Sequence, residues 1–228
     1  MANVFGHAIT NLSLAEMEAY DNNEDRAHEA DACEKKKITR KDRAYEALKA
    51  KNAHNKAKEA ERYVESLKEQ YGFGVSTLCM VYNATGDAIH HIDDHDYVGH
   101  TWKSSYPPII ENGQWGVFLH VRPAAAFFSG SYAAVVYRGK NEAGNDCDWM
   151  FAWGTPFIGS NHAFTRIREA NHFASNKYWD DISKWVAWAG PTDKDNWNGC
   201  SSMVSIGGAA SPLLEAILTQ ETAVASNV

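Results

Sequence analysis

Residues 146–153 read DCDWMFAW, and their alternation decides the fold class of this chain. Cys147, Trp149, Phe151 and Trp153 occupy every second position. Successive side chains of a β-strand point to opposite faces, so these four residues share one buried face of a strand. The same pattern predicts strands at residues 77–83, 88–92, 114–121, 131–137, 164–169 and 202–206. Short strands separated by Gly, Asn and Pro turns predict a mainly β protein, an antiparallel β-sandwich.

Two segments of this region do not follow the strand pattern. Residues 178–189 (YWDDISKWVAWA) carry Trp179, Ile182, Trp185 and Val186 at helical spacing, which favours a helix or loop packed on the sheet by its tryptophans. Residues 211–219 begin with Ser-Pro and continue LLEAIL, a start typical of a helix. The same stretch also suits a closing strand, so both alternatives stay open.

The composition of the chain changes near Phe73. Residues 7–71 contain no Gly, Pro or Trp, whereas all eight Trp, all six Pro and 15 of the 16 Gly follow Tyr71. Helices tolerate Gly and Pro least, while turns between strands require them. We therefore expect a helical arm at residues 1–71 and a β-sandwich domain at residues 72–228.

Within the arm, two capping signals mark helix starts. Ser13 with Glu16 predicts a short helix from about Leu14 to Tyr20, and Thr39 with Asp42 predicts a helix or helix pair over about 40–71. Residues 21–38 are polar and read as a linker. Because residues 1–37 hold few apolar anchors, we expect them to dock only lightly. The second half of the later helix should pack on the sandwich through Ala60, Tyr63, Val64, Leu67 and Tyr71.

Charge excludes some partners. The formal net charge is −7, and residues 73–228 hold 9 basic and 15 acidic side chains. Binding of nucleic acid needs a surplus of Lys and Arg on one face, so we expect no nucleic-acid partner. Because acidic side chains outnumber basic ones in the sandwich, an anionic ligand is disfavoured there. We expect a small ligand to be neutral or zwitterionic, as a glycan or a lipid head group is.

The remaining global signals concern compartment and catalysis. The start of the chain lacks a basic segment followed by an apolar one, and no apolar run is long enough to span a bilayer. Cys33, Cys79, Cys147 and Cys200 form no CxxC pair and are expected to be thiols. We therefore expect a protein that is not secreted and is located in the cytoplasm, with the nucleus as the alternative. No GxSxG, HExxH, P-loop or GxGxxG motif is present, so no catalytic residue is assigned.

Several long motifs together resemble a known plant family. TLCMVYNATGD, DHDYVGH, NGQWGVFLHV, AAVVYRGKN, DCDWMFAW and WNGCSSMVSIGG are similar to segments of the 23 kDa jasmonate-induced proteins. In the arm, DRAYEALKAKN and KEQYGFGVST are similar too, although the polar stretch around residues 21–37 is longer than the resemblance implies. The β part further resembles the sandwiches of aegerolysins, actinoporin-like toxins and the sphingomyelin/cholesterol binder nakanori. The resemblance implies a soluble, stress-inducible plant protein with no established enzymatic activity.

One cluster of imidazoles and carboxylates suggests a metal site. Residues 90–96 read HHIDDHD, and on a regular strand His91, Asp93 and His95 would share a face. Such a set suits a divalent transition metal. The spacing matches no fixed zinc motif, and a solvated or hydrogen-bonded role for these side chains stays open, as does a pH-sensitive loop that includes His100.

Aromatic side chains outside the strand patterns are the other candidates for a binding site. Trp and Tyr on the loops of a sandwich can stack on sugars, hold a quaternary ammonium group or anchor at a membrane interface. Core packing is the competing role for each of them. The candidate ligand-binding residues are Trp102, Tyr178, Trp179 and Trp197, with His95 and His100 as polar partners.

These observations predict a non-enzymatic, lectin-like or lipid-headgroup-binding sandwich of the plant stress response. Two alternatives remain. In the first, the helical arm docks a macromolecular partner, such as the ribosome or another protein, and the sandwich is a scaffold. In the second, the His/Asp segment binds a metal. The sequence does not specify the oligomeric state.

Overall fold

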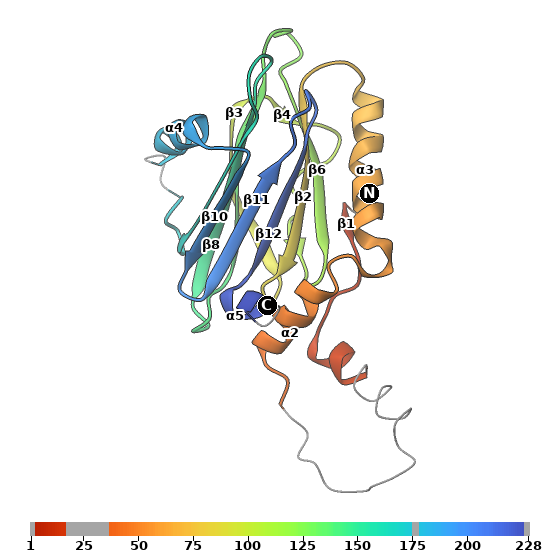
Figure 1. The fold of residues 1–228 in the computed structure, drawn as a ribbon, viewed down its shortest axis with the longest axis vertical. Coiled ribbons are helices and arrows are strands. Elements are labelled where there is room, and N and C mark those ends of the chain that lie inside the picture. Colours follow the sequence, from red (N-terminus) through yellow and green to blue (C-terminus); the bar gives the residue numbers. More distant parts are fainter. Residues whose placement is uncertain (1–2, 17–36, 175–177, 226–228) are drawn as a thin grey trace, which may run out of the picture.

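A computed structural model describes residues 3–16, 37–174 and 178–225 of this protein, which form a sandwich of two β-sheets (Figure 1). The mainly β, sandwich architecture predicted from the sequence is confirmed. The seven-stranded sheet contains, in spatial order, β1 (Val4–Phe5), β6 (Trp115–Val121), β2 (Ser76–Ala84), β12 (Leu213–Gln220), β11 (Cys200–Ile206) and β10 (Thr192–Trp197), with β4 (His100–Thr101) also paired to β6. The five-stranded sheet contains β5 (Ile109–Ile110), β3 (Ile89–Val98), β7 (Ser131–Lys140), β8 (Asp146–Thr155) and β9 (His162–Glu169).

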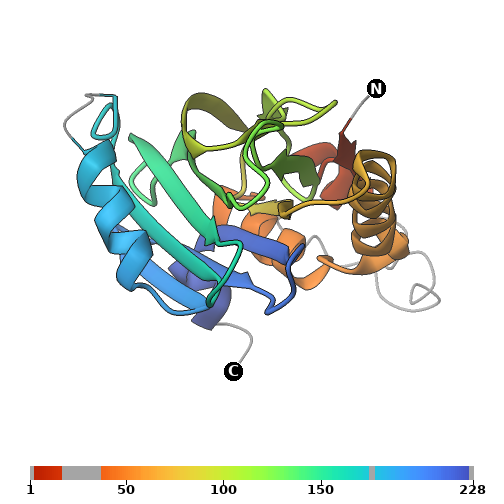
Figure 2. The same ribbon diagram turned by 90° about the horizontal axis from the view of Figure 1, so that it is seen from above.

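Helices cover the outer face of each sheet. The arm contributes α2 (Arg40–Lys49), the 3-10 turn η1 (Ala53–Asn55) and α3 (Lys56–Tyr71), and α3 lies along the outer face of the seven-stranded sheet (Figure 2). The helix pair expected over residues 40–71 is therefore present. On the other side, α4 (Trp179–Trp188) packs on β8 and β9, and α5 (Glu221–Ala225) ends the described chain beside α2.

The core between the two sheets contains the residues that the alternation singled out. Cys147, Trp149, Phe151 and Trp153 of β8 are fully buried there, opposite residues of β2, β6, β11 and β12. The ambiguous segment 211–219 is a strand, since β12 pairs in parallel with β2 and antiparallel with β11. Strand β12 thus joins the middle of its sheet, and its register puts Leu214, Ala216 and Leu218 into this core.

A second core lies under the arm. Strands β2 and β6 are buried at every position, because their outward side chains pack beneath α2 and α3. Ala60, Val64 and Leu67 of α3 supply the helical side of this contact, at the 3–4 residue spacing seen in the sequence. Lys56 at the start of α3 is buried too, and its Nζ donates to Tyr82 Oη at 2.9 Å and to the Gly113 carbonyl at 2.8 Å. Burial lowers the pKa of Lys56 to about 8.

The first residues of the chain are docked more firmly than their sequence suggested. Strand β1 pairs with β6, and the Asn3 amide donates to the carbonyls of Ser105 and Val117, each at 2.8 Å. The rings of Phe5 and Tyr63 lie 5.3 Å apart. The expectation that residues 1–37 dock only lightly is therefore wrong for residues 3–9, because a polar side chain and a two-residue strand anchor them without an apolar run.

The short helix that follows these residues starts earlier than the sequence predicted. Residues 11–16 are helical, and the reciprocal caps are between Thr10 and Ser13: Ser13 N–H donates to Thr10 Oγ1 and Thr10 N–H to Ser13 Oγ. The Ser13–Glu16 capping box was thus wrong by one turn, since the earlier threonine caps the helix. The end predicted for this helix and most of the predicted linker at 21–38 lie outside the described residues.

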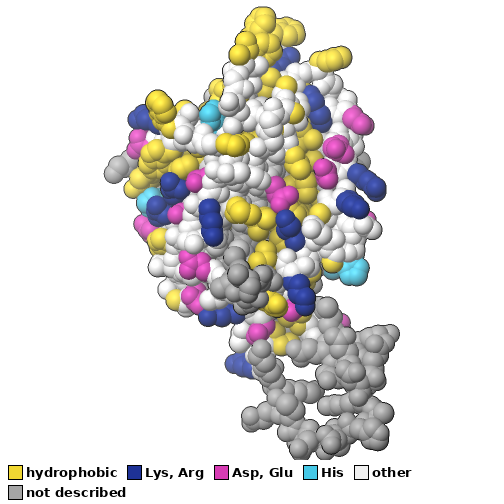
Figure 3. All heavy atoms as spheres, in the orientation of Figure 1, with side chains coloured by type: hydrophobic (Ala, Val, Ile, Leu, Met, Phe, Trp, Pro, Cys, Tyr) yellow, Lys and Arg dark blue, Asp and Glu magenta, His cyan; other side chains and the backbone are white. Residues whose placement is uncertain are grey.

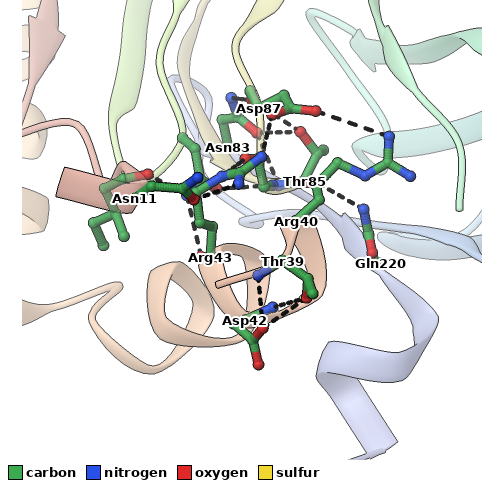
Figure 4. Close-up of polar contacts among 12 residues, drawn as sticks. Asn11, Thr39, Arg40, Asp42, Arg43, Asn83, Thr85, Asp87 and Gln220 are labelled. Carbon is green, nitrogen blue, oxygen red and sulfur yellow. Dashed lines mark hydrogen bonds and ion pairs between the residues drawn. The ribbon is translucent and has the colours of Figure 1, made fainter. Parts of the chain in front are cut away.

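A polar joint fixes α2 on the β2–β3 turn (Figure 4). The predicted capping box of Thr39 and Asp42 is present. Arg43 donates to the Gly86 carbonyl at 2.7 Å, to Asn11 Oδ1 at 2.7 Å and to the Asp87 carboxylate. Gly86 has φ +91°, and a Cβ there would lie 2.3 Å from the carbonyl oxygen of Arg40, so the turn backbone approaches α2 at a distance that only glycine permits.

We expect the substitution Arg43→Ala to lower the free energy of unfolding by about 1–3 kcal/mol, because it leaves the Gly86 carbonyl and Asp87 without this donor. Urea unfolding measures the change. The matched control is Lys41→Ala, whose ion pair with Glu142 lies on the surface and should change stability by less than about 0.5 kcal/mol. Equal effects of the two substitutions would show that the joint does not hold the arm.

Three cysteines are described, and all are buried thiols. The Cys147 and Cys200 sulfurs face each other between the sheets at 3.8 Å, and this contact, together with burial, raises the pKa of Cys147. A thiol that resists ionisation is a poor nucleophile.

We therefore expect reductant to leave the melting temperature unchanged and native Cys79, Cys147 and Cys200 to react slowly with a thiol reagent. Calorimetry with and without reductant, and labelling before and after denaturation, measure the two effects. A melting temperature that falls when reductant is added would reveal a stabilising disulfide.

Candidate functional site

Four loops meet at one end of the sandwich, and we call the surface they form the loop end. It comprises residues 72–75, 122–130, 156–161 and 207–212, at the top of Figure 1. Hydrogen bonds tie the loops together: Arg122 N–H donates to the Val75 carbonyl at 3.1 Å, and the Asn161 amide donates to the carbonyls of Gly207 and Ala209 at 2.7 and 2.9 Å. The loop end is therefore a built surface rather than four independent turns.

Large apolar side chains project from the loop end into solvent. Phe128 is 83% exposed, Ile158 is 84% exposed, and the side chain of Phe73 is fully exposed. The rings of Phe128 and Phe157 contact each other edge to face at 5.2 Å, which joins two of the loops. Figure 3 shows hydrophobic side chains gathered at this end. The exposed apolar residues of the loop end are Phe73, Phe127, Phe128, Phe157 and Ile158.

The loop end also differs from the rest of the chain in charge. None of its four loops contains an Asp or Glu, although the chain has 29 of them. The charged side chains bonded to it are cations: Arg122 belongs to the loop at 122–130, and Lys68 belongs to α3. Arg122 Nη1 donates to the carbonyls of Pro123 and Ala126, and the guanidinium lies 4.9 Å from the Phe127 ring. Lys68 Nζ donates to the carbonyls of Gly72 and Gly74, and burial together with the charge of Arg122 lowers its pKa. The loop end thus combines aromatic side chains with cations.

Helix α4 adds tryptophans beside the loop end. Trp188 is 91% exposed, and Trp185 is partly exposed with its ring 5.7 Å from that of Phe164. The chain that follows α4 runs against the start of β9, because Ala163 N–H donates to the Gly190 carbonyl at 3.0 Å and His162 Nδ1 lies 2.6 Å from the Ala189 carbonyl. Trp188 therefore lies close to the loop that carries Phe157 and Ile158.

Two of the candidate ligand-binding residues lie near the loop end. His100 and Thr101 form β4 opposite Val121 and His120, just before the loop at 122–130. His100 is exposed. Trp102 is half-buried and packs on Tyr71, with the two ring centroids 5.6 Å apart. Lys103 Nζ lies 4.7 Å from the centroid of the Trp102 ring.

The other four candidates lie elsewhere. At the start of α4, His95 stacks on Trp179 with ring centroids 5.2 Å apart. Tyr178, the residue before α4, stacks on His172 with ring centroids 4.4 Å apart. Trp179 is buried in that contact. Trp197 packs on the inter-sheet core at the end of β10 that pairs with Cys200. The structure therefore does not bring the six residues into one site.

The candidate metal ligands His91, Asp93 and His95 do not converge either. The register of β3 against β7 shifts between His91 and Asp93, which is a β-bulge. A bulge adds one residue to the strand and reverses which face the later side chains occupy. His91 accordingly stacks on Tyr106 of the inter-sheet core at 5.1 Å, while His95 stacks on Trp179 on the outer side. No group of three His, Cys, Asp or Glu side chains suited to a metal occurs in the part of the chain that is described.

The His/Asp segment has a structural explanation instead. Strand β5 pairs only with Ile89 and His90, so from Ile92 onward β3 has no neighbouring strand on that side in the described sheet. Charged and polar side chains on an edge strand discourage pairing with other chains. Asp96 has a further role, because it bonds His120 and Tyr106, each at 3.2 Å.

A cavity of about 570 Å³ lies at the side of the arm, between residues 4–14 and the turn that joins α2 to α3. Its walls are mostly apolar, and the titratable side chains among its lining residues are His7, Glu46, His54, Lys56 and Glu59. The cavity shares no lining residue with the loop end, and none of the candidates from the sequence lines it. No helix in the described residues is long and apolar enough to cross a membrane.

The exposed phenylalanines of the loop end were not among the candidates from the sequence, which were chosen from Trp, Tyr and His. A signal was present, however. Residues 122–130 (RPAAAFFSG) and 156–161 (PFIGSN) place large apolar side chains among turn residues, outside any alternating strand and without an acid. Apolar residues that no periodicity assigns to a core are the ones a loop exposes.

Comparison with known proteins agrees with this architecture. The model of the family described as Nakanori-like protein matches residues 5–221. A 23 kDa jasmonate-induced protein of Hordeum vulgare is 46% identical over 149 residues, which cover 65% of this chain and 70% of that protein. A jasmonate-induced protein homolog of Atriplex canescens is 32% identical over 81 residues, 36% of this chain and 42% of that protein.

A solved structure extends the similarity to the fold. The crystal structure of the lipid binding protein Nakanori superposes with a TM-score of 0.82 and 26% sequence identity, covering 95% of this chain and all of that one. The family match spans both the arm and the sandwich, as the sequence resemblance implied. This chain belongs to the Nakanori-like protein family.

Proposed function

We propose that this protein binds lipid bilayers through the loop end, without catalysing a reaction. The observation that carries the proposal is the set of exposed side chains Phe73, Phe127, Phe128, Phe157 and Ile158 on loops that contain no carboxylate. Apolar patches of this kind on a folded protein mark a surface that contacts a partner or a membrane. A relative described as a lipid binding protein, with the same fold, supports a lipid as that partner.

The chemistry of the loop end suits the bilayer interface. Aromatic rings partition to the head-group region of a bilayer, and cations beside them contact head-group phosphates. Arg122 and Lys68 are bonded to loop carbonyls, so they hold the loops in place, and no carboxylate in these loops repels a lipid phosphate. The rest of the sandwich is acidic, which opposes adsorption to strongly anionic membranes. We therefore expect a bilayer with neutral or zwitterionic head groups to be the target.

Burial of one Phe side chain contributes about 1.5–3 kcal/mol. Two phenylalanines on one loop therefore supply a large part of the affinity, and removing both should weaken binding by about a hundredfold or more. The substitutions remove side chains that the fold leaves in solvent, so they should leave the melting temperature nearly unchanged.

The test is co-sedimentation with phosphatidylcholine vesicles. We expect the wild-type protein to bind and the double variant Phe127→Ala/Phe128→Ala to lose most of that binding. Leu12→Ala is the matched control, because Leu12 is also exposed but lies in the helix at residues 11–16, away from the four loops. Equal losses in the two variants, or no binding by the wild type, would contradict the proposal. A glycan array run in parallel tests the alternative that the protein binds sugars, as a lectin does, and not lipids.

The names of the two relatives lead us to propose also that jasmonate induces expression of this protein. The transcript level in the source organism, measured before and after treatment with jasmonate, tests this part by itself. An unchanged transcript would remove the stress-response role and leave the lipid-binding proposal intact.

A further inference from the structure

The cavity at the side of the arm has the size and lining of a site for a small molecule. Its volume of about 570 Å³ lies within the range of about 300–1,000 Å³ that is typical of such sites. All of its lining residues fall within residues 4–59, so the arm forms it without the sandwich. Phe5, Ile9 and Leu14 supply large apolar side chains, whereas Ala53 carries only a methyl group and leaves space. The lining can therefore enclose the apolar body of a ligand.

The cavity exists because α2 and α3 meet at a corner and do not pack side by side. In Figure 1, α3 runs along the length of the sheet, whereas α2 lies across its lower end. The turn between the two helices holds His54 at φ +54° and Asn55 at φ +59°, both in the left-handed region. This conformation is costly for residues other than glycine, and residues held in it cluster at sites that bind ligands. The costly turn keeps the corner open.

Hydrogen bonds hold the opposite wall, residues 4–14, in place. Strand β1 pairs with β6. The Gln114 side-chain amide donates to the Gly6 carbonyl at 2.8 Å, and Ile9 N–H donates to the Asn112 carbonyl at 2.7 Å. The cavity is therefore formed before any ligand arrives, as sites for small molecules usually are.

Lys56 lines the cavity with its aliphatic stem. A Cβ at Gly6 would lie 2.7 Å from Lys56 Cδ, so the wall passes directly over the methylene groups of this lysine. Lys56 Nζ is bonded to Tyr82 Oη and the Gly113 carbonyl, and neither residue lines the cavity. A ligand in the cavity therefore meets the stem of Lys56, while the ammonium group is already bonded elsewhere.

The charged groups left for a ligand are carboxylates. Glu46 of α2 and Glu59 of α3 line the cavity from its two helices. Among the described residues, the Glu59 carboxylate has no ion-pair partner, and that of Glu46 has one, the exposed Lys49, at 3.8 Å. His7 and His54 add imidazoles to the lining, which accept a hydrogen bond when they are neutral. An apolar lining beside two carboxylates suits a cation with an apolar body.

We propose that this cavity is a binding site for an amphipathic amine, a molecule with an apolar body and one protonated amino group. The apolar body lies against the side chains of residues 4–14 and the turn after α2, and the ammonium group lies at Glu59, with Glu46 as the second carboxylate. The site is separate from the loop end, so the proposal does not rest on lipid binding.

The test is titration calorimetry on the full chain at about pH 7.5, where an alkylamine is protonated, as a lysine side chain is. Three probes share one apolar body and differ in the charge of the head: phenylbutylamine is cationic, phenylbutanol neutral and phenylbutyrate anionic. We expect the amine to bind severalfold more tightly than the alcohol, and the carboxylate to bind least. The amine should also raise the melting temperature, because a ligand of the folded state stabilises that state.

Variants that fill the cavity locate the bound probe. Ala53→Phe places a ring in the cavity from the turn after α2 and should weaken amine binding by about tenfold or more, because the ring takes the space of the ligand. Ala8→Phe does the same from the opposite wall and keeps the test valid if the first variant folds poorly. Lys58→Phe is the matched control, since Lys58 is exposed on α3 outside the lining, and should bind the amine like the wild type.

A further pair of variants tests the carboxylate. Glu59→Gln should weaken binding of the amine by about two- to fivefold, the effect of a solvent-accessible ion pair, and leave binding of the alcohol unchanged. Glu61→Gln removes the same charge from an exposed position of the same helix outside the lining and should change neither.

The outcomes decide both the site and its ligand class. Absence of heat from the amine, with no rise in melting temperature, overturns the proposal. Alcohol or carboxylate binding as tight as that of the amine overturns the assignment of a cationic ligand. Amine binding that both filled variants retain in folded form places the probe elsewhere and overturns the site. Vesicle binding is independent of all three results, because the variants of the loop end test it.

Discussion

Burial of β2 and β6 on both faces is the constraint on which the rest of the structure depends. One face packs against the five-stranded sheet and the other against the arm, so neither strand has a face for solvent. A sheet buried on both sides needs a cover of helices, as parallel sheets do. The arm is therefore part of the folded unit. The contact between arm and sheet is close enough to bury a lysine, since Lys56 of α3 is enclosed between them and bonds Tyr82 of β2.

That constraint also determines where the protein can present a binding surface. Helices cover the outer faces of the sheets, the polar joint of α2 occupies the β2–β3 turn, and an edge of charged side chains runs along β3. The loops at the opposite end from this joint carry exposed apolar residues on a scaffold that is rigid beneath them. Function in sandwiches commonly lies in such loops, because strands fix their ends while their sequences can vary.

Most of the fold could be predicted from the sequence, because period-two alternation and Gly/Pro composition report directly on strands and turns. Strand β10 (TDKDNW) was missed for a physical reason. Its inward residues Asp193 and Asp195 accept hydrogen bonds from the backbone of β9, at Thr165 N and Ile167 N, so an acid stands where alternation would place an apolar residue. The bulge in β3 could not be seen either, since it changes pairing without changing residue type.

The candidate site was less predictable than the fold. Trp102 and His100 lie near the loop end, but stacking partners hold Trp179 and His95 elsewhere, and only tertiary contacts reveal which aromatic residues are covered. The phenylalanines of the loop at 122–130 differ from core phenylalanines only in context. His120 of β6 and Ser131 of β7 come within 2.8 Å of each other because their two sheets pack face to face, and local sequence does not encode such a tertiary contact.

The position of β12 has a consequence for how the chain is made. This strand follows all the other described strands in the sequence, yet it lies between β2 and β11 in the middle of its sheet. Strand β2 is made well before β12, and until β12 follows, one edge of β2 leaves its backbone N–H and C=O groups unpaired. The seven-stranded sheet can close only after β12 has been made, so a nascent chain that stops before β12 carries an open edge in the middle of that sheet.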